Sequence, residues 1–109
     1  MCEIMSIRGD WLPATIAASG TTSSEVDLGK TDWDLLDIQF PTLTSCSISL
    51  QVAEASGGTF YALGSSINTG TITGAYATTF KLGGWRYIKV VSSATQASER
   101  LIRVRGTNY

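Results

Sequence analysis

The chain contains no histidine. Histidine is the commonest general base at neutral pH and the commonest metal ligand, so its absence excludes every catalytic arrangement built on that residue. Carboxylates remain as candidates, and the only acidic cluster is formed by Asp32, Asp34 and Asp37. Such a cluster is more often a solvated strand entry than a calcium site. We therefore expect no metal, no cofactor and no enzymatic activity.

Cysteine is nearly absent as well. Cys2 and Cys46 are the only two, and their spacing fits neither a zinc site nor a disulfide framework. No stretch approaches the length of a membrane span, which needs about 18 apolar residues or more. Glu3 and Arg8 interrupt the first residues, so we expect no signal peptide and a soluble product made in the cytoplasm. A net charge of −1 predicts neither nucleic acid nor an anionic membrane as a partner.

Serine, threonine and glycine are abundant in this chain of 109 residues. That composition is typical of β-proteins, and the length suits one domain. Short segments with a two-residue apolar period alternate with turn residues. We predict an all-β, single-domain antiparallel β-sandwich, jelly-roll-like, with about eight short strands over residues 13–109. Residues 1–12 are predicted to form an N-terminal arm, because their apolar side chains have no clear partner strand.

The two clearest predicted strands are 33–40 and 46–53, in which alternate residues are apolar. Their buried faces are predicted to consist of Leu36, Ile38, Phe40, Ile48, Leu50 and Val52. Pro41 ends the first of these strands because it has no backbone N–H to donate. The pair Gly57-Gly58 is predicted to turn the chain back after the second. The other predicted strands are 14–18, 25–28, 59–63, 71–73, 77–82, 85–92 and 99–105.

The segment GGWRYIKVVS, residues 83–92, mixes aromatic, basic and β-branched side chains. On a strand Ile88 and Val90 share one face, and Trp85 and Tyr87 share the other. Both faces are mainly apolar, which indicates a strand that is covered on both sides. The favoured interpretation is a core strand with Trp85 packed under the loop 93–98. A subunit contact, a sugar platform and a single-stranded nucleic-acid site are the alternatives.

Charge is unevenly distributed along the chain. Eight of the nine acidic residues lie in 1–54, and six of the eight basic residues lie in 55–109. Either oppositely charged strands are neighbours within the fold, which is slightly favoured, or opposite faces of a subunit meet other subunits. In the second case outward arginines of the last strand pair with the acidic cluster of a sister subunit or a coat protein. The proposed interface residues are Ile4, Ile7, Trp11, Trp85, Tyr87, Arg100, Arg103, Arg105, Asp32, Asp34 and Asp37.

Five segments carry a resemblance to a known group of proteins. They are TIAASGTTSSEVDLG (15–29), LLDIQFP (35–41), SISLQVAEASGGTFYAL (47–63), GWRYIKVVS (84–92) and ASERLIRVRG (97–106). Together they resemble small all-β structural proteins encoded by tailed phages and prophages, over most of residues 14–106. The resemblance lies in strand motifs and includes no catalytic signature. Where the pattern tends to have DGG, this chain has SGG at 56–58, which alters only the turn.

The resemblance implies a virion component, with the phage major capsid protein or other virion proteins as partners. We predict a non-enzymatic capsid decoration (cement) protein at the capsid surface, made in the host cytoplasm. It would bind and stabilise the assembled shell as a homo-oligomer, a dimer or trimer. The first alternative is a tail, baseplate or fibre module that binds host glycan through exposed aromatic residues such as Trp11, Trp33, Trp85 or Tyr76. The second is a secreted bacterial carbohydrate-binding domain.

Overall fold

The computed structural model describes residues 7–29, 33–63, 73 and 75–108. Regular structure in these residues is entirely β, with nine strands that pair antiparallel in two sheets. The prediction of an all-β antiparallel sandwich is confirmed. The strands are β1 (Ile7–Arg8), β2 (Leu12–Ile16), β3 (Val26–Asp27), β4 (Leu35–Phe40), β5 (Ile48–Ala53), β6 (Tyr61–Ala62), β7 (Tyr76–Lys81), β8 (Tyr87–Ser92) and β9 (Arg100–Asn108).

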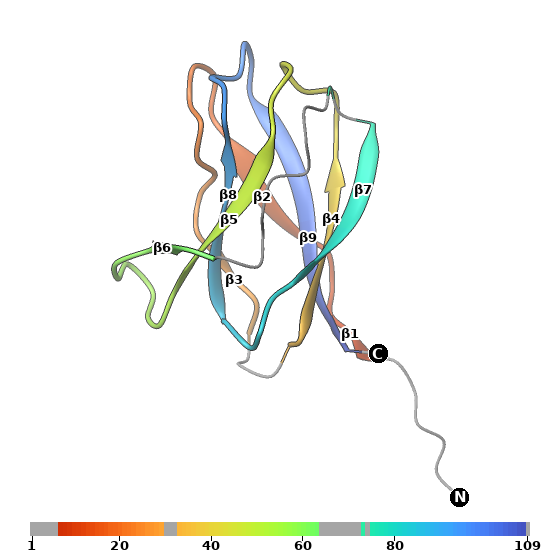
Figure 1. Ribbon diagram of the computed structural model, residues 1–109, viewed down its shortest axis with the longest axis vertical. Coiled ribbons are helices and arrows are strands. Elements are labelled where there is room, and N and C mark those ends of the chain that lie inside the picture. Colours follow the sequence, from red (N-terminus) through yellow and green to blue (C-terminus); the bar gives the residue numbers. More distant parts are fainter. Residues whose placement is uncertain (1–6, 30–32, 64–72, 74, 109) are drawn as a thin grey trace, which may run out of the picture.

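The strand order is that of a jelly roll. Sheet A has the order β1-β9-β4-β7, and β2 pairs with β9 further along the same edge; sheet B has the order β3-β8-β5-β6. The pairs β5–β6, β4–β7, β3–β8 and β2–β9 are nested, so the chain folds back on itself from the β5–β6 turn. Figure 1 shows the two sheets facing each other with loops at both ends. This double-sheet arrangement corresponds to two Greek keys.

The core lies between the sheets and uses the predicted alternating positions. All six apolar residues predicted for the two clearest strands are buried: Leu36, Ile38, Phe40, Ile48, Leu50 and Val52. Ile88 and Val90 of β8 have no exposed surface either. Each such side chain contributes about 1.5–3 kcal/mol of transfer free energy on burial. The core-strand part of the favoured interpretation is confirmed for residues 87–92, and β8 lies between β3 and β5.

Strand ends differ from the prediction at several points. β8 begins at Tyr87 rather than at 85, because the turn at Gly83 and Gly84, both with positive φ, continues through residue 86. β9 extends to Asn108, since β4 and β1 supply partners beyond residue 105. The predicted strand 59–63 is reduced to β6. Of the strand predicted at 71–73, only residue 73 is described, and it lies outside any strand.

Part of the predicted N-terminal arm pairs within its own domain. β1 pairs with β9 in the register Ile7↔Asn108 and Arg8↔Thr107. The Gly9 N–H also donates to the Gly106 carbonyl, at 2.8 Å. β2 then begins at Leu12. Residues 7 and 8 therefore have a partner strand, contrary to the prediction, and residues 1–6 lie outside the described part of the chain.

Trp33 fills one end of the core. Its side chain is 4% exposed, and its indole Nε1–H donates to the Leu28 carbonyl at 3.0 Å. The ring packs on Gly106, where a Cβ atom would lie only 2.3 Å from Trp33 Cγ. Trp33 is thus a core residue, which contradicts its place among the exposed aromatic residues considered for glycan binding.

Gln96 connects three loops at the other end of the sandwich. It is 1% exposed, and its Oε1 accepts the Thr44 N–H at 2.9 Å while its Nε2 donates to Ser92 Oγ at 2.9 Å. Its backbone N–H donates to the Gly20 carbonyl at 3.0 Å. Its side chain thus joins the loop before β5 to the end of β8, and its backbone holds the loop after β2 against the β8–β9 connection.

Candidate interaction face

The outward surface of sheet A gathers several of the residues proposed as an interface. We call it the outer face of sheet A and define it as Trp11, Asp37, Gln39, Ala77, Thr79, Leu101, Arg103 and Arg105. The strand registers place these side chains in rows. Asp37 of β4 lies opposite Arg105 of β9 and Thr79 of β7, and Gln39 lies opposite Arg103 and Ala77. Residues of the same sequence parity point to one face, so all of them lie away from the core.

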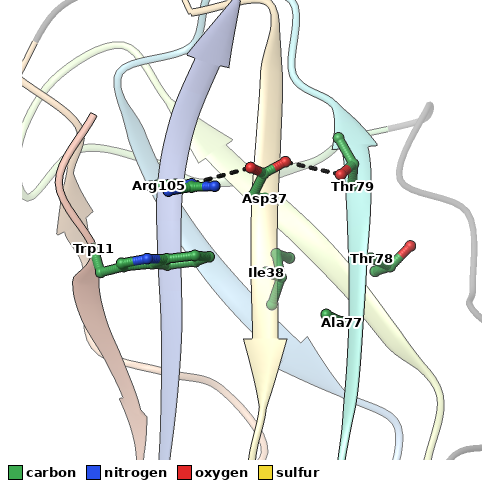
Figure 2. Close-up of a pocket in the computed structure, with 7 residues that line it drawn as sticks. All are labelled: Trp11, Asp37, Ile38, Ala77, Thr78, Thr79 and Arg105. Carbon is green, nitrogen blue, oxygen red and sulfur yellow. Dashed lines mark hydrogen bonds and ion pairs between the residues drawn. The ribbon is translucent and has the colours of Figure 1, made fainter. Parts of the chain in front are cut away.

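Asp37 is the centre of the first row. Arg105 Nε donates to Asp37 Oδ2 at 3.1 Å, and Thr79 Oγ1 donates to Asp37 Oδ1 at 2.8 Å. Asp37 is only 8% exposed, so both of its carboxylate oxygens need partners. Figure 2 shows the three side chains in line across β9, β4 and β7. A charge-assisted bond of this kind, partly open to solvent, stabilises the fold by about 1 kcal/mol.

Trp11 extends this row over β9. The Arg105 guanidinium carbon lies 4.3 Å from the centroid of the Trp11 ring, which is a cation–π contact. In Figure 2 the indole crosses β9 toward Ile38, below the Arg105–Asp37 pair. Beside it is an open hollow of about 310 Å³ that Trp11, Asp37, Thr79 and Arg105 help to line. Trp11 is still 38% exposed, so the ring is held in place but remains accessible.

The second row continues the face toward the other end of the strands. Arg103 is exposed, and Leu101 is 51% exposed, which makes it one of the most exposed large apolar side chains among the described residues. A smaller hollow of about 180 Å³ lies between Gln39, Pro41, Leu101 and Arg103. The outer face of sheet A therefore combines an aromatic ring, two arginines and an apolar side chain on adjacent strands.

The pairing predicted between outward arginines and the acidic cluster occurs within one chain. Arg105 binds Asp37 of its own β4, so this pair does not need a second subunit. On sheet B, Arg86 and Asp27 form another ion pair at 2.7 Å. The slightly favoured interpretation, that oppositely charged strands are neighbours in the fold, is confirmed for both pairs. Arg86 and the Gly29 N–H lower the pKa of Asp27 because both donate hydrogen bonds to its carboxylate.

The other proposed interface residues are dispersed. Arg100 is turned to the loops, where its side chain donates to Gln96 Oε1 at 3.3 Å and to Thr44 Oγ1 at 3.2 Å. Asp34 is exposed at the β3–β4 end, and Asn108 Oδ1 accepts its backbone N–H. Ile7 lies in β1, while Ile4 and Asp32 lie outside the described residues.

Trp85 and Tyr87 belong to sheet B. Trp85 was predicted to pack under the loop 93–98, and this prediction is wrong. Its side chain instead lines a hollow with residues of the β5–β6 hairpin, between positions 54 and 61. The turn before β8 and the loop after it lie at opposite ends of the sandwich, so the predicted contact is geometrically excluded (Figure 1). Tyr87 is half-buried on the outward face of β8, and Arg86 lies over its ring at 5.2 Å.

The described residues can also be compared with the requirements of a metal site and of a membrane span. They contain no group of three or more histidine, cysteine, aspartate or glutamate side chains that could hold a metal ion. They also contain no helix long and apolar enough to cross a membrane. Thr79 and the contact of Trp11 with Arg105 escaped the sequence analysis, because the β4–β7 and β2–β9 registers join segments that are distant in the chain.

No family model matches this chain, and no curated protein sequence matches it. Among solved structures it is similar to the SPBc2 prophage-derived protein YomS, with a TM-score of 0.65, 11% identity and 99% of each chain covered. It is also similar to a chain of the cyanophage Pam1 capsid asymmetric unit, with a TM-score of 0.40, 15% identity, and 98% of this chain and 87% of that one covered. The likeness to YomS shows a shared fold along the whole chain.

Proposed function

We propose that this protein is a non-enzymatic structural component of a tailed-phage virion, a capsid decoration protein that binds the assembled shell. The outer face of sheet A carries this proposal. Tryptophan and arginine are the residue types that most often dominate protein–protein binding energies, and here they stand beside an exposed leucine. Arg105 is held by Asp37 and Trp11 by Arg105, so little side-chain freedom remains to be lost on binding.

The fold supports the proposal. YomS, which shares the fold over the whole chain, is described as prophage-derived. Jelly rolls occur in viral capsid proteins and also in lectins, so the fold alone does not select a function. The strand motifs that resemble phage structural proteins include β4, β5, β8 and β9, which supply much of the core.

The proposed action is stabilisation by binding. A protein that binds only the assembled shell shifts the assembly equilibrium by mass action, with no need for catalysis. We further propose that it acts as a dimer or trimer at the capsid surface, since virion assemblies are commonly symmetric. Its partner would be the major capsid protein, and its synthesis would take place in the host cytoplasm.

Sedimentation with capsids assembled from the coat protein of the same gene cluster tests the proposal. Arg103→Glu and Leu101→Ala each alter an exposed side chain of the outer face of sheet A without touching the core. We expect each to weaken capsid binding about tenfold or more, as is typical of interface hot spots. Glu54→Lys, a charge reversal at an exposed position of the β5–β6 hairpin, is the control and should leave capsid binding unchanged. Arg105→Glu is unsuitable because it would place a second carboxylate against Asp37.

Three results would count against this assignment. Binding that survives both sheet A changes would remove the outer face of sheet A as the contact. Capsids that never bind the protein would remove the decoration role. A strict monomer in light scattering, free and on capsids, would remove the oligomer.

A further inference from the structure

A second hollow, on sheet B, is independent of the face described above. It has a volume of about 270 Å³ and lies between the β5–β6 hairpin and the residues just before β8. Figure 1 shows β6 and the hairpin turn projecting away from the sandwich, on the side opposite β7. Its lining consists of Glu54, Ala55, Gly58, Thr59, Tyr61 and Trp85. We call it the hairpin hollow.

Two aromatic side chains form its apolar part. Trp85 is half-buried and packs against the core, so its ring is fixed on one side and open to the hollow on the other. Tyr61 is 67% exposed, the most exposed of the large apolar side chains in the described residues. Aromatic rings left this accessible beside a hollow are typical of binding sites.

The polar groups that line the hollow include both hydrogen-bond donors and hydrogen-bond acceptors. The Glu54 carboxylate can only accept, whereas the Thr59 and Tyr61 hydroxyls can donate and accept. Gly58 is exposed at the edge of the hollow, and its N–H already donates to the Ala55 carbonyl at 3.0 Å. No described cation forms an ion pair with Glu54, whose carboxylate is exposed. The hollow thus offers an apolar ring surface together with several donors and acceptors.

The hairpin that forms one wall is anchored to the sandwich. Glu25, just before β3, accepts the Gly57 N–H at 2.7 Å and the Ser56 hydroxyl at 2.6 Å. Further along the hairpin, the Phe60 ring makes a cation–π contact with Lys89 of β8, whose Nζ lies 4.5 Å from the ring centroid. Both contacts tie the turn to sheet B, so the wall is formed before any ligand arrives.

We propose that the hairpin hollow binds one pyranose ring of a carbohydrate. A pyranose has an apolar C–H face that fits the electron-rich face of an aromatic ring, and an edge of hydroxyls that both donate and accept. A lysine or arginine side chain could also contact Trp85 and Glu54. Such a cation only donates, however, and would leave the donors of the hollow without acceptors. The hollow is open on one side, which leaves room for further sugar units.

Titration of the ¹⁵N-labelled full chain with methyl pyranosides tests the proposal. The panel comprises glucose, galactose, mannose, rhamnose and N-acetylglucosamine glycosides, each to about 50 mM, because one small ring binds with a millimolar constant. We expect at least one to shift the Trp85 indole signal and the backbone amides of residues 54–61. Trp85→Phe assigns that indole among the three tryptophans. Acetyl-lysine methylamide serves as the cationic probe.

Variants locate the site. Tyr61→Ala should weaken binding about tenfold, and Glu54→Gln about fivefold, since the amide keeps the shape but loses the charged acceptor. Tyr76→Ala removes an exposed tyrosine from sheet A and should change nothing. The proposal is overturned if no pyranoside shifts the hairpin, if only the lysine probe does, or if Tyr61→Ala and Tyr76→Ala act alike. Capsid binding, which depends on sheet A, should be unaffected by either hairpin change, so the two proposals fail separately.

Discussion

At the scale of single residues, Gly106 of β9 has no room for a side chain. Gly106 faces Trp33, whose ring occupies the space that a side chain would need. The sequence did not predict this contact. Trp33 was expected at the start of one strand, and Gly106 just after the end of another. The pair forms only because β9 continues past residue 105 and aligns Gly106 with Leu36. Alternation predicts which residues are buried, but not which of them touch.

We expect Gly106→Ala to destabilise the protein by about 1–3 kcal/mol, the usual cost of overpacking. The added methyl group would have to displace the indole, and with it the hydrogen bond from Trp33 to the Leu28 carbonyl. Urea unfolding followed by tryptophan fluorescence measures the change. Leu101→Ala, an exposed position on the same strand, is the control and should cost much less. Equal stability of Gly106→Ala and the parent chain would show that Trp33 can move freely.

At the scale of strands and hairpins, the alternating pattern predicted the core strands well. The buried faces of β4 and β5 follow from a clear two-residue period, and Ile88 and Val90 of β8 are buried as predicted although both faces of that strand are mainly apolar. β1 has only two residues and no pattern, so nothing in the sequence indicated that it would pair with β9. The Asp37–Arg105 contact joins residues 68 positions apart, and the register that aligns them depends on the whole fold.

Adjacent valines on β8 give a direct test of that pattern. Val90 is fully buried, whereas Val91 is half-buried on the opposite face. Val90→Asp puts an unpaired carboxylate into the core, which costs at least about 3 kcal/mol and should abolish soluble expression. Val91→Asp is matched in chemistry and should leave a folded protein with reduced stability. Circular dichroism and yield decide the outcome, and a folded Val90→Asp variant would mean that the two faces of β8 have been exchanged.

The turn of the β5–β6 hairpin should be sensitive to acid. The Gly57 N–H and the Ser56 hydroxyl lower the pKa of Glu25 below its ordinary value of 4.5 by hydrogen bonding to its carboxylate. A carboxylate with a lowered folded pKa stabilises the fold above the unfolded pKa. That contribution is lost as the pH falls from about 4.5 through the folded value.

We therefore expect the stability cost of Glu25→Gln to be largest at pH 7 and to shrink as the pH falls through the folded pKa, below which Glu25 is protonated in both states. Urea midpoints over this pH range measure the difference, and amide exchange at Gly57 reports the turn itself. Glu54→Gln is the control, because Glu54 lies on the same hairpin and its carboxylate accepts no hydrogen bond from another described residue, unlike that of Glu25. A pH-independent loss in Glu25→Gln would assign its effect to shape rather than to charge.

At the scale of the whole molecule, both edges of β9 are paired within the subunit. One edge pairs with β4, and the other is shared between β2 and β1. The sequence predicted a free N-terminal arm, but from Ile7 onward this segment completes sheet A and positions Trp11 over Arg105. The segment is thus part of the proposed binding face, and its removal should affect binding more than folding.

Deletion of residues 1–11 tests this directly. The shortened chain loses β1, the bond from Gly9 to Gly106 and the Trp11–Arg105 contact, yet it keeps β2 and the whole core. We expect a folded sandwich with a free energy of unfolding lower by about 1–3 kcal/mol, and capsid binding weakened at least tenfold. Trp11→Ala in the full chain is the matched variant: it should reproduce most of the binding loss with a smaller loss of stability. Thermal melts and capsid sedimentation separate the two effects. If the deletion unfolds the domain, β1 is an essential strand; if Trp11→Ala binds capsids like the parent chain, the ring is not part of the contact.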